Sequence, residues 1–172
     1  MSTLNLTITP NPALFARALA ASPQRLEREM NGAIQRLVAE MARSARDKAP
    51  KATSLLTHAI LPRMVGPLEG VVAAGVNYAQ AAEEGTGLWG PKKQASGKMP
   101  PVQSILDWVK TKHLTPDDPN MDEEDLAFLI ARSIAARGTP PQPFFEPTLR
   151  DFTGKGESMM SAAIERTLEA LA

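Results

Sequence analysis

The strongest constraint on the fold is the segment of residues 23–48, whose apolar side chains recur with the period of an α-helix. Steps of three and four residues place six of them on one face: Leu26, Met30, Ile34, Leu37, Met41 and Ala45. Ser22-Pro23 is a helix-start signal, and Ala49-Pro50 is a stop signal. The segment therefore predicts one long amphipathic helix, against which the rest of the chain must pack.

Shorter patterns predict the remaining elements. Leu4, Leu6 and Ile8 alternate with polar residues, which is typical of a short strand. The segments 55–62 and 71–78 have the composition of strands, and their short link predicts an antiparallel hairpin. Helices are expected over the approximate ranges 12–20, 101–112, 122–137 and 157–171.

These elements predict an α/β (α+β) fold. We expect a small, mainly antiparallel sheet with a β-hairpin packed on one long α-helix, plus helices from an insert and the C-terminus. The length of 172 residues fits a single domain, residues 1–172. Residues 102–137 are expected to form the helical insert. Residues 85–101 are expected to form a flexible or partner-ordered loop, because so long a segment without periodicity is unusual in a compact domain.

Composition narrows the possible partners. The 19 basic and 19 acidic side chains cancel, so the chain has no overall charge that would attract nucleic acid or a membrane surface. No stretch approaches the ~18 consecutive apolar residues of a transmembrane helix, and the first residues lack a secretion signal. With no Cys, the chain has no disulfide, thiolate metal ligand or Cys nucleophile. We therefore expect no membrane partner.

The long helix carries a basic face opposite its apolar face, made of Arg25, Arg28, Arg36, Arg43 and Arg46. Three of these arginines have an acid four residues later, at Glu29, Glu40 and Asp47, and such pairs would leave the face solvated and nearly neutral. Arg28 and Arg46 have no such acid. The alternative is a polyanion-binding module that uses Arg28, Arg46, Lys92 and Lys93, for example for DNA.

The predicted loop of residues 85–101 combines four Gly, three Pro and three Lys with an apolar pair, Leu88 and Trp89. On such a frame the apolar pair is a candidate anchor in an adjacent subunit. The alternative is that Trp89 folds onto the core of its own chain. The loop's Lys92, Lys93 and Lys98 could also attract the acidic stretch 117–125 of a neighbouring copy, especially Asp117 and Asp118.

The sequence does not favour an enzyme. It has two histidines, His58 in a predicted strand and His113 at a helix end, with no paired spacing for a metal. Glu83 and Glu84 are adjacent, so they cannot face each other as a catalytic carboxylate pair on a helix. The glycines of the loop match no phosphate-binding pattern. We therefore assign no catalytic residue, no metal ligand, no cofactor and no small-molecule substrate.

Three short motifs stand out by their order along the chain. The first is Ala49-Pro50-Lys51-Ala52-Thr53-Ser54-Leu55-Leu56. The second is Tyr78-Ala79-Gln80-Ala81-Ala82-Glu83-Glu84-Gly85-Thr86. The third is Pro141-Gln142-Pro143-Phe144-Phe145-Glu146-Pro147-Thr148-Leu149. Singly they are compatible with a helix stop, a turn and a rigid linker, but their combination is more specific.

This order resembles the gene-product-ten-like family of neck and tail-completion proteins from long-tailed bacteriophages, related in role to the minor tail protein Z of phage lambda. The resemblance spans roughly residues 22 to 171. Tyr78, Ala79, Ala82, Glu83, Gly85 and Thr86 match its central motif, and Pro141, Pro143 and Phe144 match its last motif. Pro50 and Thr53 match the first motif, but Ser54 stands where the family has Gly. The segment of about 87–137 is longer than the corresponding segment in the shortest members of the family.

The resemblance implies a non-enzymatic structural protein of the virion, acting in tail completion or head–tail joining at the neck. Its expected partners are further copies of itself in a ring, with six-fold symmetry expected from the tail, and adjacent neck, terminator or tail-tube proteins. The expected location is the neck or tail of the virion, and the host cytoplasm during assembly. The alternatives are a tail terminator, and transient contact with DNA.

The family motifs also suggest roles for individual residues. Tyr78 and Glu83 are expected to fix the geometry between hairpin and loop. One residue of the pair Phe144 and Phe145 is expected to be buried as an inward anchor. The other, which we take to be Phe145, is expected to contact a partner.

Overall fold

The computed structural model describes residues 2–4, 6–51, 54–95 and 98–170. Over these residues it has seven helices and a three-stranded antiparallel sheet, which confirms the expected α+β class. The chain divides into two compact units. Unit 1 comprises Met1–Lys48, His58–Gly75 and Phe144–Ala172, and unit 2 comprises Ala49–Thr57 and Val76–Pro143. The interpretation of residues 1–172 as a single domain stays a prediction.

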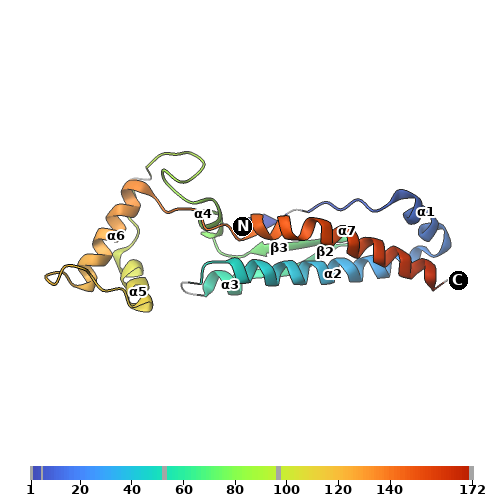
Figure 1. Ribbon diagram of the computed structural model, residues 1–172, viewed down its shortest axis with the longest axis horizontal. Helices are drawn as coiled ribbons and strands as arrows, with labels where there is room; N and C mark the ends of the chain where they lie inside the picture. The colour runs from blue at the N-terminus through green and yellow to red at the C-terminus, as the bar shows by residue number, and fades with distance from the viewer. Residues whose placement is uncertain (1, 5, 52–53, 96–97, 171–172) are drawn as a thin grey trace. The chain divides into compact units, whose positions relative to one another are not determined.

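Unit 1 is built on two long helices, α2 (Pro23–Lys48) and α7 (Phe145–Glu169), which lie side by side in opposite directions (Figure 1). The apolar face of α2 is buried as the periodicity predicted, at Leu26, Met30, Leu37, Met41 and Ala45, and Ile34 is half-buried. The short helix α1 (Pro12–Ala21) packs on both long helices. Its first turn is capped by Asn11, whose side chain accepts hydrogen bonds from two backbone N–H groups.

The sheet has the strand order β1-β3-β2, with β1 (Ser2–Leu4), β2 (Ile60–Gly66) and β3 (Glu69–Ala74). The predicted antiparallel hairpin is confirmed: β2 and β3 pair with Leu61 opposite Ala73, around a turn at Pro67 and Leu68. The predicted second strand over residues 71–78 is only partly correct, because β3 ends at Ala74. The predicted first strand over residues 4–8 is only partly correct. It ends at Leu4, and residues 6–10 have no regular structure.

The prediction that a strand begins at Leu55 was wrong. Residues Leu55–Ala59 form the short helix α3, and β2 begins only at Ile60. The Thr57 hydroxyl donates to the Ser54 carbonyl oxygen at 2.7 Å, a local contact that favours a helical turn. His58 is therefore an exposed residue at the end of a helix rather than a half-buried strand residue.

The last helix begins twelve residues earlier than predicted, at Phe145 instead of about residue 157. Pro147, Gly154 and Gly156 discouraged a helix in the sequence. Pro147 lies in the first turn, where a helix needs no backbone N–H. Gly156 is where Ile8 packs: a Cβ there would lie 2.5 Å from Ile8 Cδ1. Tertiary packing therefore favours a glycine that helix propensity does not.

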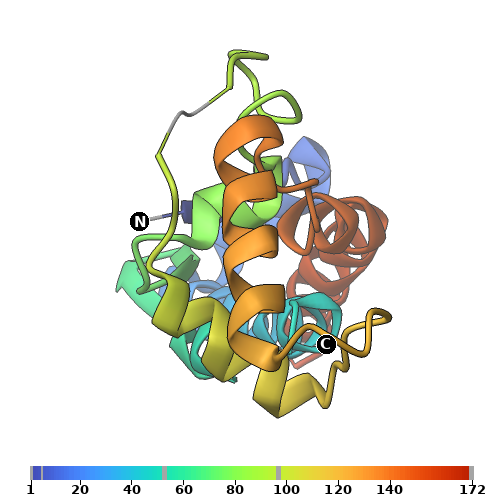
Figure 2. The ribbon, with the colours of Figure 1, turned by 90° about the vertical axis from the view of Figure 1, so that its left-hand side faces the viewer.

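Unit 2 contains the predicted insert helices α5 (Val102–Lys112) and α6 (Glu123–Arg137), which lie side by side (Figure 2). Leu106, Val109 and Ala127 form their buried contact, with Trp108 and Ile130 partly buried against it. Asp122 and Asp125 form a capping box at the start of α6. The short helix α4 (Ala79–Glu84) precedes the loop of residues 85–101, whose described residues form neither helix nor strand.

Candidate assembly surface

The base of the loop is fixed by a backbone contact between residues 85–88 and residues 137–139, which we call the clasp. The Thr86 N–H donates to the Thr139 carbonyl oxygen at 2.9 Å, and the Leu88 N–H donates to the Arg137 carbonyl oxygen at 2.9 Å. The Thr86 hydroxyl lies 2.8 Å from the Thr139 hydroxyl and also accepts a hydrogen bond from the Thr139 N–H. The central motif therefore ends in a tertiary anchor to the end of α6.

Glycine is required on both sides of the clasp because the two backbones approach closely. Gly85, Gly87 and Gly138 all have positive φ, at 76°, 62° and 83°. A Cβ on Gly138 would lie 2.0 Å from the Thr86 carbonyl oxygen, and one on Gly87 would lie 2.6 Å from that of Arg137. The motif glycine Gly85 is similarly confined, because a Cβ there would lie 2.9 Å from the Thr139 carbonyl oxygen. These positions combine strained backbone with no space for a side chain.

The other residues of the central motif start helix α4. Tyr78 is the N-cap residue, its carbonyl oxygen accepts from the Ala82 N–H, and its side chain is 40% exposed. Ala79 is fully buried, and Glu83 is half-buried. The Ala82 carbonyl oxygen accepts from the Gln142 N–H at 2.8 Å, a second link to the segment after α6. The expectation that Tyr78 and Glu83 fix local geometry stays a prediction.

The apolar pair of the loop lies directly after the clasp and remains exposed. Leu88 exposes 51% of its surface and Trp89 exposes 58%, which argues against the alternative that Trp89 folds onto its own core. The Trp89 N–H donates to the Thr86 carbonyl oxygen at 3.2 Å, so its backbone is attached to the clasp. The backbone of Trp89 is thus held at a defined point while its large apolar ring is exposed to solvent, and exposed apolar patches often mark interaction sites.

A groove with a volume of about 540 Å³ separates α4 from the same loop. Its lining is mixed, with Gln80 and Glu84 from α4 and with Thr86, Pro91 and Lys92 from the loop. Gln80 donates to the Glu84 carboxylate along the helix. The loop of unit 2 therefore contributes both a mixed groove and an exposed apolar pair to the surface.

Two further exposed apolar side chains of unit 2 were missed by sequence reasoning. Phe128 and Leu129 on α6 are 47% and 46% exposed. The signal was present, because residues 126–131 of α6 are apolar on every side of the helix, and one face is enough to pack on α5. Gly138 and Thr139, the partners in the clasp, carry no sequence signal that marks their role.

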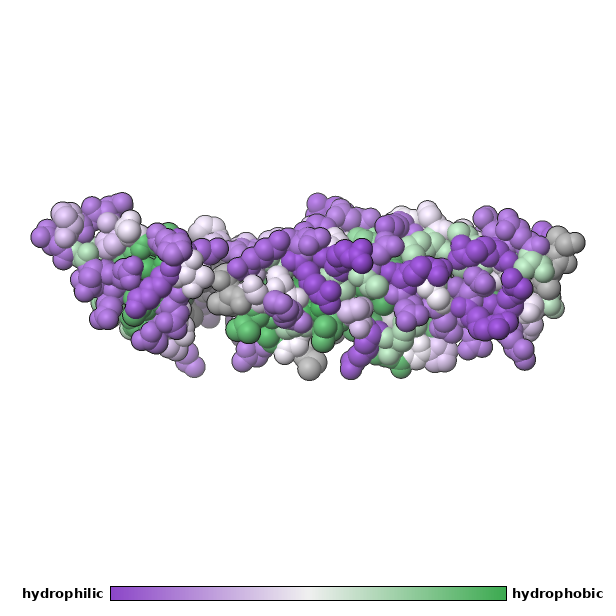
Figure 3. Space-filling model, turned by 90° about the horizontal axis from the view of Figure 1, so that it is seen from below, coloured by the Kyte–Doolittle hydropathy of each residue, from purple (hydrophilic) through white to green (hydrophobic). Residues whose placement is uncertain are grey.

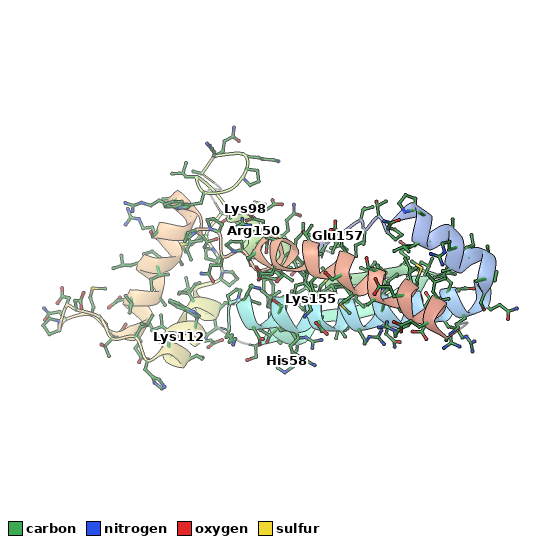
Figure 4. All side chains as sticks on the ribbon, turned by 45° about the vertical axis from the view of Figure 1, so that its right-hand side comes forward. His58, Lys98, Lys112, Arg150, Lys155 and Glu157 are labelled. Carbon is green, nitrogen blue, oxygen red and sulfur yellow. The ribbon has the colours of Figure 1, made fainter. Side chains whose placement is uncertain are left out.

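The charged candidates lie on the surface of unit 2, and their pairing between copies stays a prediction. Lys92, Lys93 and Lys98 are exposed on the loop, where Figure 4 labels Lys98. Asp117 and Asp118 are also exposed, and the Asp118 carboxylate accepts hydrogen bonds from the backbone and side chain of Asn120. The acids at 122–125 are used locally, at the start of α6.

The basic face of α2 is arranged differently from the prediction. Glu29 and Glu40 do not pair with arginines of their own helix: Glu29 pairs with Arg166 at 3.2 Å, and Glu40 pairs with Lys155 at 2.5 Å. Figure 4 shows Lys155 directed from α7 toward α2. Arg25 and Arg36 therefore do not pair with the acids expected to neutralise them. The face of unit 1 in Figure 3 combines hydrophilic side chains with smaller apolar areas.

The polyanion candidates are divided between the two units. Arg28 lies on α2 in unit 1 and is exposed, whereas Lys92 and Lys93 belong to unit 2. Arg46 is engaged locally, because its Nε donates to the Ile60 carbonyl oxygen at 2.8 Å and fixes the start of β2. A polyanion surface on α2 would therefore consist of Arg28 with Arg25 and Arg36, which border one pocket together with the acid Glu29.

The remaining motif residues are structural in character. Phe144 and Phe145 are both buried, 0% and 6% exposed, with ring centroids 4.5 Å apart. This corrects the expectation that one of them is a partner contact. Pro143 is exposed and Pro50 is half-buried, while Thr53 lies outside the described residues.

The described part of the chain shows no grouping of three or more His, Asp or Glu side chains that could hold a metal ion. Among the same residues, no helix has the length and apolar character needed to cross a bilayer. Compared with known proteins, the chain matches no family model, no curated protein and no solved structure.

Proposed function

We propose that this chain is a non-enzymatic structural protein of a long-tailed bacteriophage, acting as part of a ring in tail completion or head–tail joining at the neck. The observation that carries the proposal is the clasp. The Gly85-Thr86 end of the central motif holds a loop base from which Leu88 and Trp89 extend into solvent. A motif whose structural effect is to present an apolar anchor supports a role in binding other protein chains.

The first test asks whether the protein is part of a particle. Heads, tails and whole particles from a lysate of the source phage are separated on a density gradient, and each fraction is analysed by mass spectrometry. We expect a few copies per particle in whole phage and free tails. Absence from every particle fraction would refute the proposal.

A second arm of the same experiment tests the exposed anchor. A Trp89→Ser chain, supplied in place of the natural one, should be depleted from tails and whole particles because the indole no longer enters a neighbour. The matched control is Leu19→Ser, which removes an apolar side chain of 46% exposure from unit 1. Equal incorporation of both variants would show that Trp89 is not the anchor.

A tail terminator is the alternative within the same class, and a polyanion-binding module is the alternative outside it. The second is supported by α2, where Glu29 and Glu40 pair with α7 instead of neutralising Arg25 and Arg36. This module would be favoured by a DNA affinity that falls steeply as the salt concentration rises. In the double variant Arg28→Ala with Arg36→Ala the affinity should then fall less steeply with salt. Salt-independent or absent binding would exclude it.

A further inference from the structure

Unit 1 contains an apolar cavity of about 510 Å³ that the proposed function does not use. One wall is α2, another is the hairpin, and a third is the N-terminal arm, by which we mean residues 2–8; Asn5 is outside the described residues. The lining is largely aliphatic, including Leu4, Leu6, Ile34, Leu37, Val38 and Val72. A cavity of this size means that the N-terminal arm does not pack closely on α2 and the hairpin.

The arm uses only part of the strand edge beside this cavity. Ser2, Thr3 and Leu4 pair with Ala74, Ala73 and Val72 of β3. The same register, continued, would place Leu6 opposite Gly70 and Thr7 opposite Glu69. Residues 6–8 are not in a strand, so they do not extend the pairing along the first half of β3. An open strand edge is a template for pairing with another chain.

The shape of the cavity suits a longer strand with the sequence of the arm. Leu4, Leu6 and Ile8 alternate, so a continued strand would turn Leu6 to the same face as the buried Leu4. Opposite Leu6 would be Gly70, which has no side chain and lies close on α2: a Cβ there would be 2.7 Å from Val38 Cγ1. Glycine at this position allows β3 to lie close to α2.

The arm of the same chain is held away from this edge by its connection to α1. Ile8 is seated on α7 at Gly156, where no Cβ would fit. Leu14 and Phe15 of α1 then pack on the cluster formed with α2 and α7. Only three residues, Thr9 to Asn11, separate Ile8 from the first residue of α1. The arm of a second copy is connected to its own α1, so its position along this β3 is not fixed by the Ile8 of this chain.

We propose that assembled copies exchange N-terminal arms, so that the arm of one copy pairs with β3 of the next and inserts Leu6 into the apolar cavity. Exchange keeps the three residue pairs that β1 and β3 form within one chain. It adds the pairs of Leu6 with Gly70 and of Thr7 with Glu69, so the exchanged strand makes more contacts with β3 than the present one. Giving the arm to one neighbour and receiving it from another is a heterologous contact, which can close into a ring. The inference rests on the self-assembly in the proposed function.

Engineered disulfides can test this exchange, because the natural chain has no Cys. Thr3→Cys with Ala73→Cys joins the arm to β3, and Leu61→Cys with Ala73→Cys joins the two strands of the hairpin. Antiparallel partners have Cα separations of about 4.5–5.5 Å, within the range that a disulfide spans. The two variants share Ala73→Cys and differ only in whether the partner strand belongs to the arm.

Both variants are oxidised over a range of protein concentrations and run on a non-reducing gel. We expect T3C/A73C to give covalent dimers and larger species, whereas L61C/A73C gives only monomers because its strands are joined by a short turn. Only monomeric T3C/A73C at every concentration would overturn the exchange. If T3C/A73C does not fold, T7C/E69C takes its place, since these residues are partners in the lengthened strand, and the same outcomes apply.

This result is independent of the particle experiment. Covalent multimers of a chain absent from phage particles would refute the neck function and leave the exchange standing. A chain present in particles that forms only intramolecular disulfides would support the neck function and refute the exchange.

Discussion

Single residues decide whether the clasp can form. Gly138 is the tightest position, because its φ of 83° and the Thr86 carbonyl oxygen both exclude a side chain. Thr86 is the most connected one, since its N–H, hydroxyl and carbonyl oxygen each take part in a hydrogen bond. The motif residue Thr86 thus acts through a partner 53 residues later in the chain.

Gly138→Ala should lower the free energy of unfolding of unit 2 by about 1–3 kcal/mol, because the new methyl group forces two backbones apart at a strained position. Urea unfolding followed by tryptophan fluorescence measures it, since Trp89 and Trp108 both belong to unit 2. The control is Gly154→Ala on α7, where a Cβ meets nothing within 4 Å. That change should stabilise unit 1 by about 0.5–1 kcal/mol in the same titration followed by circular dichroism. A neutral Gly138→Ala would contradict the role of the clasp.

The sequence identified Gly85 and Thr86 as motif residues but could not show their partners. The hydrogen bonds of Thr86 reach Thr139, and no local pattern connects residues so far apart. Phe144 and Phe145 show a different limit of the sequence. Because the two neighbours have the same side chain, the sequence could not tell which of them is buried, and the structure buries both.

At the scale of elements, periodicity was reliable where one face is long and apolar. It gave α2, and it placed α5 and α6 within one or two residues of their bounds. It failed at Leu55–Ala59, a short apolar run that fits a strand or a helix equally well, and before residue 157 of α7. In α7 the interior glycines Gly154 and Gly156 are tolerated because packing against α2 and α1 stabilises the helix.

The start of α6 gives a prediction for an element. Asp122→Ala removes the side-chain acceptor for the Asp125 N–H and half of the capping box, so it should cost about 1 kcal/mol of unfolding free energy. Trp108, which packs on the α5–α6 contact, reports the change by its fluorescence during urea unfolding. Asp117→Ala, an exposed acid in the preceding segment, is the control and should stay within about 0.5 kcal/mol. Equal effects of both changes would mean that the cap does not stabilise α6.

At the scale of the whole molecule, ion pairs join the helices α2 and α7. Lys48 pairs with Asp151 at 2.7 Å, in addition to the pairs of Glu29 and Glu40 with α7. Such partly exposed pairs contribute about 0–1 kcal/mol each. In unit 2 the lysines of the loop and Asp117-Asp118 are exposed.

Reversing Asp117 and Asp118 to Lys should therefore impair assembly if these acids meet Lys92, Lys93 or Lys98 of a neighbour. The measurement is the yield of joined particles on the density gradient. Glu157→Lys with Glu165→Lys on α7 changes the net charge by the same amount at two exposed positions of unit 1 (Glu157 is labelled in Figure 4). Normal assembly of the Asp117 and Asp118 variant would refute the pairing, and equal impairment by both variants would point to net charge alone.

The sequence by itself determined the α+β class, the long helix α2 and the hairpin, because local periodicity and turn residues specify them without distant contacts. Tertiary structure alone decided the clasp, the early start of α7, the pairing of Glu29 and Glu40 with α7, and the cavity under the arm. In each of these cases the deciding partner lies far away in the chain, and a pattern read along the sequence carries no information on which distant surfaces meet.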